Sequence, residues 1–171
     1  MGYTFFLAAS LFSIYRRRVG VELQHKFIKR IYQECLAVSG NRFRSWAFGL
    51  LREVVEFDSA IWCKGEIRSG ALRSVTTTLL PSSYTTSFDR MRRHNPIYLH
   101  AWDNPGQLFD LADIYPNRKE RNDCQIVQRL YQPAKITQQC GVLHTDASPG
   151  SFTYMEFYKT NTKKRFSPLD K

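Results

Sequence analysis

The sequence predicts an α+β fold, with one antiparallel sheet and helices packed on its faces. The chain has 171 residues, 43% of them hydrophobic and 23% charged, which is the size and composition of one globular domain. Segments in which side chains alternate between two faces, as in a β-strand, occur in pairs joined by short turns, with one pair in each half of the chain. Segments with helical periodicity precede and separate these pairs. This order of hairpins and helices is the basis of the prediction.

Two helices are expected before the first hairpin. Residues 21–38 carry apolar side chains at steps of three and four, so one face of that helix is buried. Ser39, Gly40 and Asn41 interrupt it, and Asn41 can cap the helix that follows. The second helix has the more regular pattern, with an apolar face made of Phe43, Trp46, Ala47, Leu50, Leu51 and Val54.

A hairpin is expected after these helices. Residues 58–66 are predicted to form a strand, and residues 71–80, rich in threonine, its antiparallel partner. Gly65 and Gly70 lie at the turn between them. Successive side chains of a strand point to opposite faces, so the first strand presents Ala60 and Trp62 on one side and Ile61 and Cys63 on the other.

Two short helices are expected next. The first begins at Ser82, and the second begins at Asn95 and Pro96. Asparagine is a good cap and proline is tolerated at the first helical position, so this dipeptide is typical of a helix start. The apolar side chains are Tyr84, Phe88 and Met91 on the first helix and Ile97, Tyr98 and Trp102 on the second.

The last third of the chain is expected to complete the sheet. Residues 107–114 are predicted to form a third strand, and a helix lies between Pro116 and Pro133. Residues 136–144 and 151–159 are predicted strands, joined by a linker rich in turn-forming residues. These two segments form the second hairpin.

Residues 1–20 are expected to form an extension separate from a single domain at residues 21–171. Residues 2–15 are almost uncharged and are followed by three arginines. The run is shorter than the roughly 20 residues that span a bilayer, and its basic residues follow it, whereas in a signal peptide they precede it. Three alternatives stay open: a segment that touches a membrane, a segment appended by an early start, and a helix packed on the domain or on a partner subunit.

Four segments carry a resemblance to a known family. They are WAFGLLREVVEFDSAIW (residues 46–62), HNPI (94–97), NPGQLFDLAD (104–113) and RFSPLD (165–170). Together they resemble the GAF-like N-terminal sensing domain of LuxR-type bacterial transcription regulators. The resemblance extends over most of the chain from residue 27 onward, although it includes no chemical signature.

The resemblance implies a GAF/PAS-like antiparallel sheet flanked by helices and a cytoplasmic, signal-sensing function. In that family a helix-turn-helix domain follows the sensor, and none follows in this chain, so contact with DNA is expected only through such an absent domain. The expected partner is a small apolar ligand of unknown identity. Apolar residues on more than one stripe of the helix at residues 21–38 favour a homodimer.

The chain departs from the family's acyl-homoserine-lactone sensors at three positions. Those sensors have a Trp, a Tyr four residues later and an Asp-Pro beyond it, where this chain has Ser82, Thr86 and Asn95. The carboxylate that accepts the lactone's amide N–H is therefore expected to be missing. An acyl-homoserine lactone is not the expected ligand.

An aromatic set is the predicted ligand site. It could line one space between the sheet and the two short helices, and its members are Trp62, Tyr84, Phe88, Met91, Tyr98 and Trp102. Small-ligand pockets are mostly apolar with a few polar anchors, which this set can supply. The alternative is an ordinary filled core with the same residues.

Catalytic motifs are missing from the sequence. It has no G-x-S-x-G, P-loop, dinucleotide-binding or H-E-x-x-H pattern, so an enzyme is not expected, nor is a cofactor. His144 and Asp146 offer two metal ligands without a third. Cys63 and Cys140 lie in strands and could face one cavity, which leaves a small redox enzyme of GAF-like fold as an alternative. A structural dimerisation module without a ligand is the other alternative.

The charge of the chain is strongly basic. Lys and Arg number 25 against 15 Asp and Glu, a formal net charge of +10. These residues are scattered and are not interleaved with aromatic residues, so the chain alone is not expected to recognise nucleic acid. Four cysteines without a C-x-x-C pair indicate reduced thiols in the cytoplasm.

Overall fold

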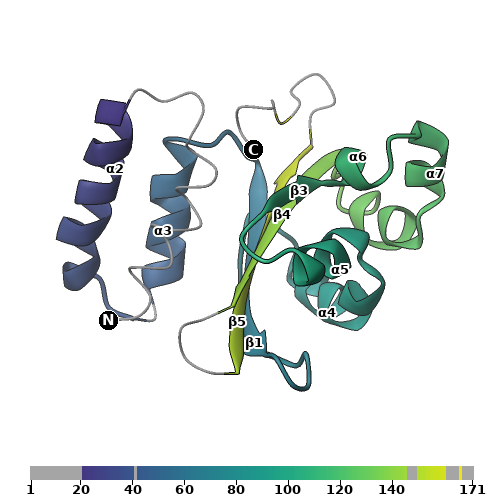
Figure 1. Cartoon of the computed structure of the whole chain (residues 1–171), viewed down its shortest axis with the longest axis horizontal. Coiled ribbons are helices and arrows are strands. Elements are labelled where there is room, and N and C mark those ends of the chain that lie inside the picture. The colour runs from purple at the N-terminus through teal and green to yellow at the C-terminus, as the bar shows by residue number, and fades with distance from the viewer. Residues whose placement is uncertain (1–20, 41, 146–149, 161–165, 167–171) are drawn as a thin grey trace.

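The computed structural model of the chain describes residues 21–40, 42–145, 150–160 and 166. Within this part of the chain, five strands form one sheet with helices on both faces (Figure 1). Helix α3 (Phe43–Arg52) covers one face, and α2 (Val21–Glu34) lies on the side of α3 away from the sheet. The other face carries α4 (Ser82–Met91), α5 (Pro96–Asp103), α6 (Leu111–Ile114) and α7 (Arg118–Asp123). The predicted α+β class is confirmed.

The sheet is antiparallel throughout. Its strands are β1 (Ser59–Glu66), β2 (Leu72–Thr78), β3 (Leu108–Asp110), β4 (Gln138–Thr145) and β5 (Ser151–Lys159). They lie in the order β2-β1-β5-β4-β3, so β5 is central and pairs with β1 and β4. Both predicted hairpins are confirmed. The register places Cys63 of β1 beside Tyr154 of β5 and Tyr154 beside Leu143 of β4.

Two predicted elements differ from those observed. The predicted strand at residues 107–114 stops after Asp110, because the Asp110 side chain accepts the backbone N–H of Asp113 and begins α6. The predicted helix between Pro116 and Pro133 is divided. Cys124 has an extended backbone and ends α7, and a π-helix, η3 (Val127–Tyr131), follows.

The start of α5 is confirmed as predicted. Asn95 caps the helix, since its side-chain oxygen accepts the backbone N–H groups of Ile97 and Tyr98 at 3.0 and 3.4 Å. Pro96 occupies the first helical position, where it lacks no hydrogen bond. This cap fixes the end of α5 against the sheet and places Asn95 in the interior.

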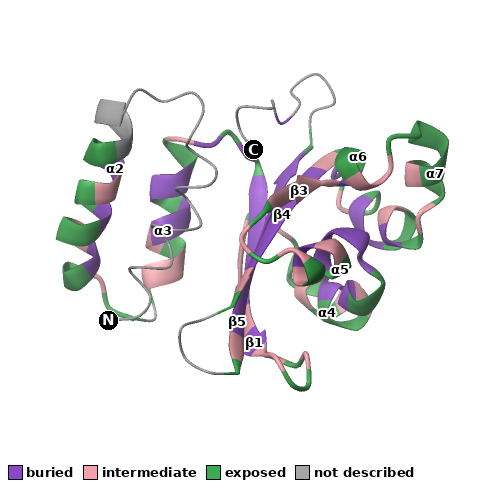
Figure 2. Ribbon diagram, viewed as in Figure 1, coloured by how far each residue is buried: buried purple, intermediate pink, exposed green. Residues whose placement is uncertain are grey.

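The core consists of two clusters, one on each face of the sheet. Figure 2 shows the buried side of the helices turned toward the strands. On β1, Ala60 and Trp62 join the cluster under α2 and α3, whereas Ile61 and Cys63 join the cluster under α4 and α5. The predicted alternation of this strand is confirmed, and it determines which side chains can share a site.

Some sequence-based predictions concern residues whose structure is not described. Those on residues 1–20 lie outside the described ranges, as does the basic tail apart from Phe166. Asp146 lies outside them too, so the position of its carboxylate relative to His144 is not described. In the ranges that are described, no helix has the length and apolar character needed to cross a membrane.

Candidate functional site

The structure divides the six predicted site residues between the two faces of the sheet. Five lie in the cluster under α4 and α5, namely Tyr84, Phe88, Met91, Tyr98 and Trp102. Trp62 lies in the cluster under α2 and α3, with its ring centroid 5.9 Å from that of Phe48. Because the sheet separates them, Trp62 does not line one space with the other five, contrary to the sequence-based expectation. Ligand binding by the five stays a prediction.

Four of the five, all except Met91, pack on aromatic side chains of β5. Tyr98 stacks on Trp102 with ring centroids 5.9 Å apart and meets Tyr154 edge-on at 5.0 Å. Trp102 meets Phe152 edge-on at 4.9 Å. Met91 and Trp102 are half-buried at the margin of this layer, while the other three are buried.

A buried carboxylate lies at the centre of the same face. Glu156 of β5 is 0% exposed, and two tyrosine hydroxyl groups donate to it. The Tyr131 hydroxyl lies 2.5 Å from Oε1, and the Tyr154 hydroxyl lies 2.8 Å from Oε2. Asn95 donates from Nδ2 to Oε2 at 3.2 Å. Three donors from three elements thus compensate the loss of water around this side chain.

Asn95 connects this carboxylate to α5. Its Nδ2 also donates to the Tyr131 hydroxyl oxygen at 3.0 Å, while its oxygen caps the helix. An aspartate could cap α5 equally well but could not donate to Glu156. The amide therefore suits a position between a helix start and a buried carboxylate. Tyr131 belongs to the π-helix, an element that occurs often at functional sites.

Burial raises the pKa of the Glu156 carboxyl from its ordinary value of 4.5 to about 7. The hydrogen bonds from Tyr131 and Tyr154 act in the opposite direction, since they stabilise the ionised form. Burial, and then the charge of Glu156, raise the pKa of both tyrosines well above its usual value. Both hydroxyl groups therefore keep their protons and remain donors at neutral pH.

Three further hydroxyl groups in this cluster are buried and make no hydrogen bond of good geometry to a described residue, although each lies near a polar side chain. They belong to Tyr84 on α4, Tyr98 on α5 and Tyr158 on β5. Buried polar groups are almost always paired with protein, water or ligand, so three such groups in one cluster require an explanation. We refer to Asn95, Tyr131, Tyr154, Glu156 and these three tyrosines as the tyrosine–glutamate cluster.

Comparison with known proteins supports the fold. No protein-family model matches the sequence, and no curated protein matches it. The structure is similar to that of the VqsR ligand-binding domain from Pseudomonas aeruginosa, with a TM-score of 0.61 and 13% sequence identity over 88% of this chain and 86% of that one. The two chains share a fold.

A second solved structure is more distant. It is the N-acylhomoserine lactone dependent LuxR family transcription factor CepR2 from Burkholderia cenocepacia. Its TM-score is 0.46 and its sequence identity 9%, over 95% of this chain and 81% of that one.

The alternative in which Cys63 and Cys140 face one cavity is not what the structure shows. Cys63 lies in the cluster under α4 and α5, whereas Cys140 lies in the cluster under α2 and α3. Burial raises the pKa of the Cys63 thiol, the reverse of what a reactive cysteine requires. Among the described residues no group of three or more metal-ligating side chains could hold a metal ion.

Sequence reasoning missed Glu156, although one signal was available. The strand at residues 151–159 reads SFTYMEFYK, in which a single glutamate interrupts an otherwise apolar centre. Alternation places Glu156 on the same face as Tyr154 and Tyr158. A carboxylate between two tyrosines on one face of a central strand is a pattern that indicates a buried polar site.

Replacing Met91 by alanine is expected to lower the free energy of unfolding by about 1–2 kcal/mol. A fully buried methionine would lose more, but Met91 is half-buried at the margin of its cluster. Urea unfolding of the single variant measures this loss. A loss above about 3 kcal/mol would show that Met91 is an essential part of a filled core.

Proposed function

We propose that this chain is the small-ligand-sensing domain of a LuxR-type transcription regulator, with its ligand bound at the tyrosine–glutamate cluster. The observation that carries the proposal is the set of three buried hydroxyl groups, on Tyr84, Tyr98 and Tyr158, that make no hydrogen bond of good geometry to a described residue. A bound molecule with polar atoms at these positions would satisfy them. The fold shared with a ligand-binding domain and the resemblance described above support the proposal.

The chemistry of the cluster favours a small, largely apolar and uncharged ligand with acceptor oxygens. Glu156 already accepts three hydrogen bonds, and the Asn95 oxygen accepts two. The groups that make no hydrogen bond of good geometry to a described residue are hydroxyls, which can donate to a carbonyl or ether oxygen. Aromatic rings surround them, so most of the ligand surface would meet apolar side chains.

The proposed action is sensing without a catalytic step. Ligand contact with Tyr98 on α5 and Tyr84 on α4 would shift these helices and so influence a helix-turn-helix domain in a homodimeric, cytoplasmic regulator. The redox alternative is less favoured, because Cys63 and Cys140 lie on opposite faces of the sheet. A structural dimerisation module remains the second candidate, and exposed Tyr32 on α2 and Leu36 just beyond it (39% and 86%) favour it.

Phenylalanine variants of the cluster are expected to separate satisfied from unsatisfied hydroxyl groups. Without ligand, Tyr131→Phe should destabilise the protein by about 1–3 kcal/mol, because it leaves buried Glu156 with one donor fewer. Tyr158→Phe should cost less, since the Tyr158 hydroxyl makes no hydrogen bond of good geometry in the protein. Urea unfolding of both variants measures the difference. Equal losses would mean that the Tyr158 hydroxyl is satisfied in the unliganded protein.

The proposal itself is tested by a thermal-shift screen of small metabolites on the full chain. A ligand should raise the melting temperature of the wild type and of Trp62→Phe, which alters the opposite face of the sheet. Tyr98→Phe and Tyr158→Phe should bind that ligand at least about tenfold more weakly. Binding that these two variants leave unchanged would overturn the assignment of the site.

A further inference from the structure

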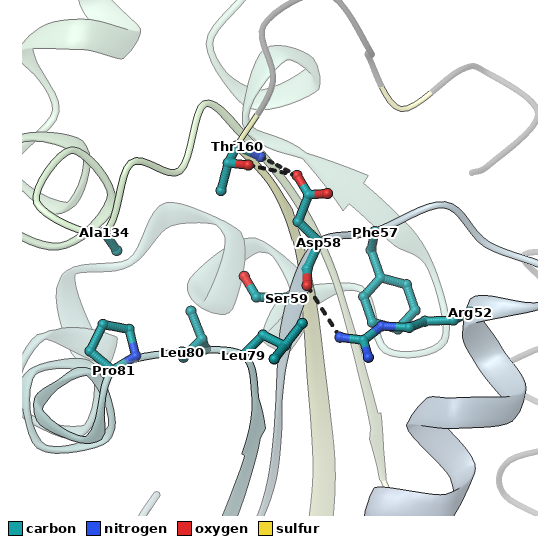
Figure 3. Close-up of a pocket in the computed structure, with 9 residues that line it drawn as sticks. All are labelled: Arg52, Phe57, Asp58, Ser59, Leu79, Leu80, Pro81, Ala134 and Thr160. Carbon is teal, nitrogen blue, oxygen red and sulfur yellow. Dashed lines mark hydrogen bonds between the residues drawn. The ribbon is translucent and has the colours of Figure 1, made fainter.

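An open groove lies at the end of the sheet, outside the tyrosine–glutamate cluster. It has a volume of about 520 Å³, within the range of small-ligand sites, and lies where β1 begins and where β2 and β5 end (Figure 3). One side is apolar and includes Phe57, Leu79, Leu80 and Pro81. Arg52, the last residue of α3, supplies the cationic group. Among the described residues that line it, the groove therefore combines an apolar wall with one cationic side chain.

Hydrogen bonds hold the Arg52 guanidinium in place, but they do not use all of its N–H donors. Its Nη2 donates to the backbone oxygen of Asp58 and to Thr78 Oγ1, both at 3.2 Å. Its central carbon lies 5.1 Å from the Phe57 ring centroid, which keeps the plane of the group against an apolar surface. Nε and Nη1 make no hydrogen bond to any described residue. These donors are available to an acceptor in the groove.

The nearby carboxylate does not neutralise this charge. Asp58 Oδ2 accepts the backbone N–H of Thr160 at 2.7 Å and its hydroxyl at 2.8 Å. Figure 3 shows the carboxylate turned toward Thr160, while Arg52 reaches the backbone oxygen of Asp58. Within the described ranges no ion pair joins Arg52 to Asp58. Arg52 thus faces the groove as a cation without a carboxylate partner.

Leu79 presents an apolar side chain at the rim of the groove. It is 77% exposed, and its φ of 55° lies in the left-handed region that leucine rarely adopts. Strained residues of this kind persist where the surrounding structure holds them, often at ligand-binding positions. An exposed leucine in this conformation, next to Leu80 and Pro81, offers a surface for a hydrocarbon chain.

We infer that this groove binds an aliphatic monocarboxylate, with its carboxylate on Arg52 and its hydrocarbon chain along Phe57 and Leu79. Arginine is well suited to carboxylate because its planar donors match the two oxygens. Among the described lining residues Arg52 is the one cation, and it lies beside the Asp58 carboxylate, which favours a ligand with one negative charge over a phosphate monoester with two. The site is distinct from the proposed sensing site and does not depend on it.

Titration of the full ¹⁵N-labelled chain with sodium octanoate tests the inference. Saturable shifts are expected at Arg52, Ser59 and Leu79, with a Kd of about 1 mM. Arg52→Gln should weaken binding at least about tenfold, and Leu79→Ser about threefold or more. Arg90→Gln is the matched control, because it removes the same charge from an exposed arginine on α4, outside the groove. Uncharged 1-octanol should bind more weakly than octanoate.

The inference would be overturned by the absence of saturable shifts up to about 10 mM octanoate, by equal binding of octanoate to Arg52→Gln and the wild type, or by equal binding of octanol and octanoate. Octanoate shifts confined to Tyr154, Glu156 and Tyr158 would also overturn it, and would instead support the sensing site. Failure of the groove leaves the proposed function unaffected, because no argument for the tyrosine–glutamate cluster uses Arg52.

Discussion

Replacing Glu156 by glutamine is expected to remove about 3 kcal/mol of pH dependence from the stability of the protein. The carboxyl ionises with a pKa of about 7 in the folded chain and near its ordinary value of 4.5 in the unfolded chain. Between these values the folded protein binds the proton more tightly. Its contribution to stability is fully present below pH 4.5, falls as the pH rises, and is lost once the pH passes about 7. Glutamine mimics the protonated acid and does not titrate.

The measurement is the free energy of unfolding in urea from about pH 4.5 to pH 8, with wild type and variant compared at each pH. Other titrating groups, including four histidines, contribute equally to both proteins and cancel in the difference. Glu120→Gln, at an exposed position on α7, is the control and should retain the wild-type slope. Parallel curves for wild type and Glu156→Gln would show that Glu156 titrates normally and is not desolvated by the fold.

The strands were predictable because alternation and turn residues are local signals. Residues 151–159 were expected as a strand and form β5, Ser151–Lys159. The helices were less predictable where a side chain forms a hydrogen bond with a backbone N–H group. At Asp110 the carboxylate accepts a backbone N–H and replaces the expected strand by a helical turn. At Cys124 an extended backbone separates α7 from the π-helix, which no periodicity indicates.

The site was only partly predictable, because it depends on which face of the sheet each helix pair covers. The alternation of β1 correctly separated Trp62 from Cys63. The alternation did not reveal that α3, with α2 behind it, packs on the face that carries Trp62. Because of this arrangement, Trp62 lies apart from the other aromatic residues of the predicted site. The partners of Glu156 are equally remote, since Tyr131 lies 25 residues away in the chain and Asn95 lies 61 away. Only the folded sheet brings them together.

Replacing Phe88 by alanine is expected to destabilise the protein by about 3–5 kcal/mol. The Phe88 side chain is 0% exposed, and its contact with a ligand stays a prediction. Its ring stacks on Tyr84 and Tyr154, with centroids 6.4 and 6.0 Å away. Phe88 therefore occupies a filled part of the cluster, and its removal opens a cavity that neighbouring rings cannot close.

Phe48→Ala is the matched control for this prediction. Phe48 is 1% exposed and packs on Trp62 and Phe57 on the other face of the sheet. Phe48→Ala should therefore lower the free energy of unfolding by a similar amount. The two faces are independent clusters, and the milder Phe88→Leu and Phe48→Leu changes should therefore be additive to within about 0.5 kcal/mol in the double variant. Chemical denaturation of the variants measures both quantities. A loss below about 1 kcal/mol for Phe88→Ala, with a normal loss for Phe48→Ala, would place Phe88 at the edge of an unfilled ligand cavity rather than in the core.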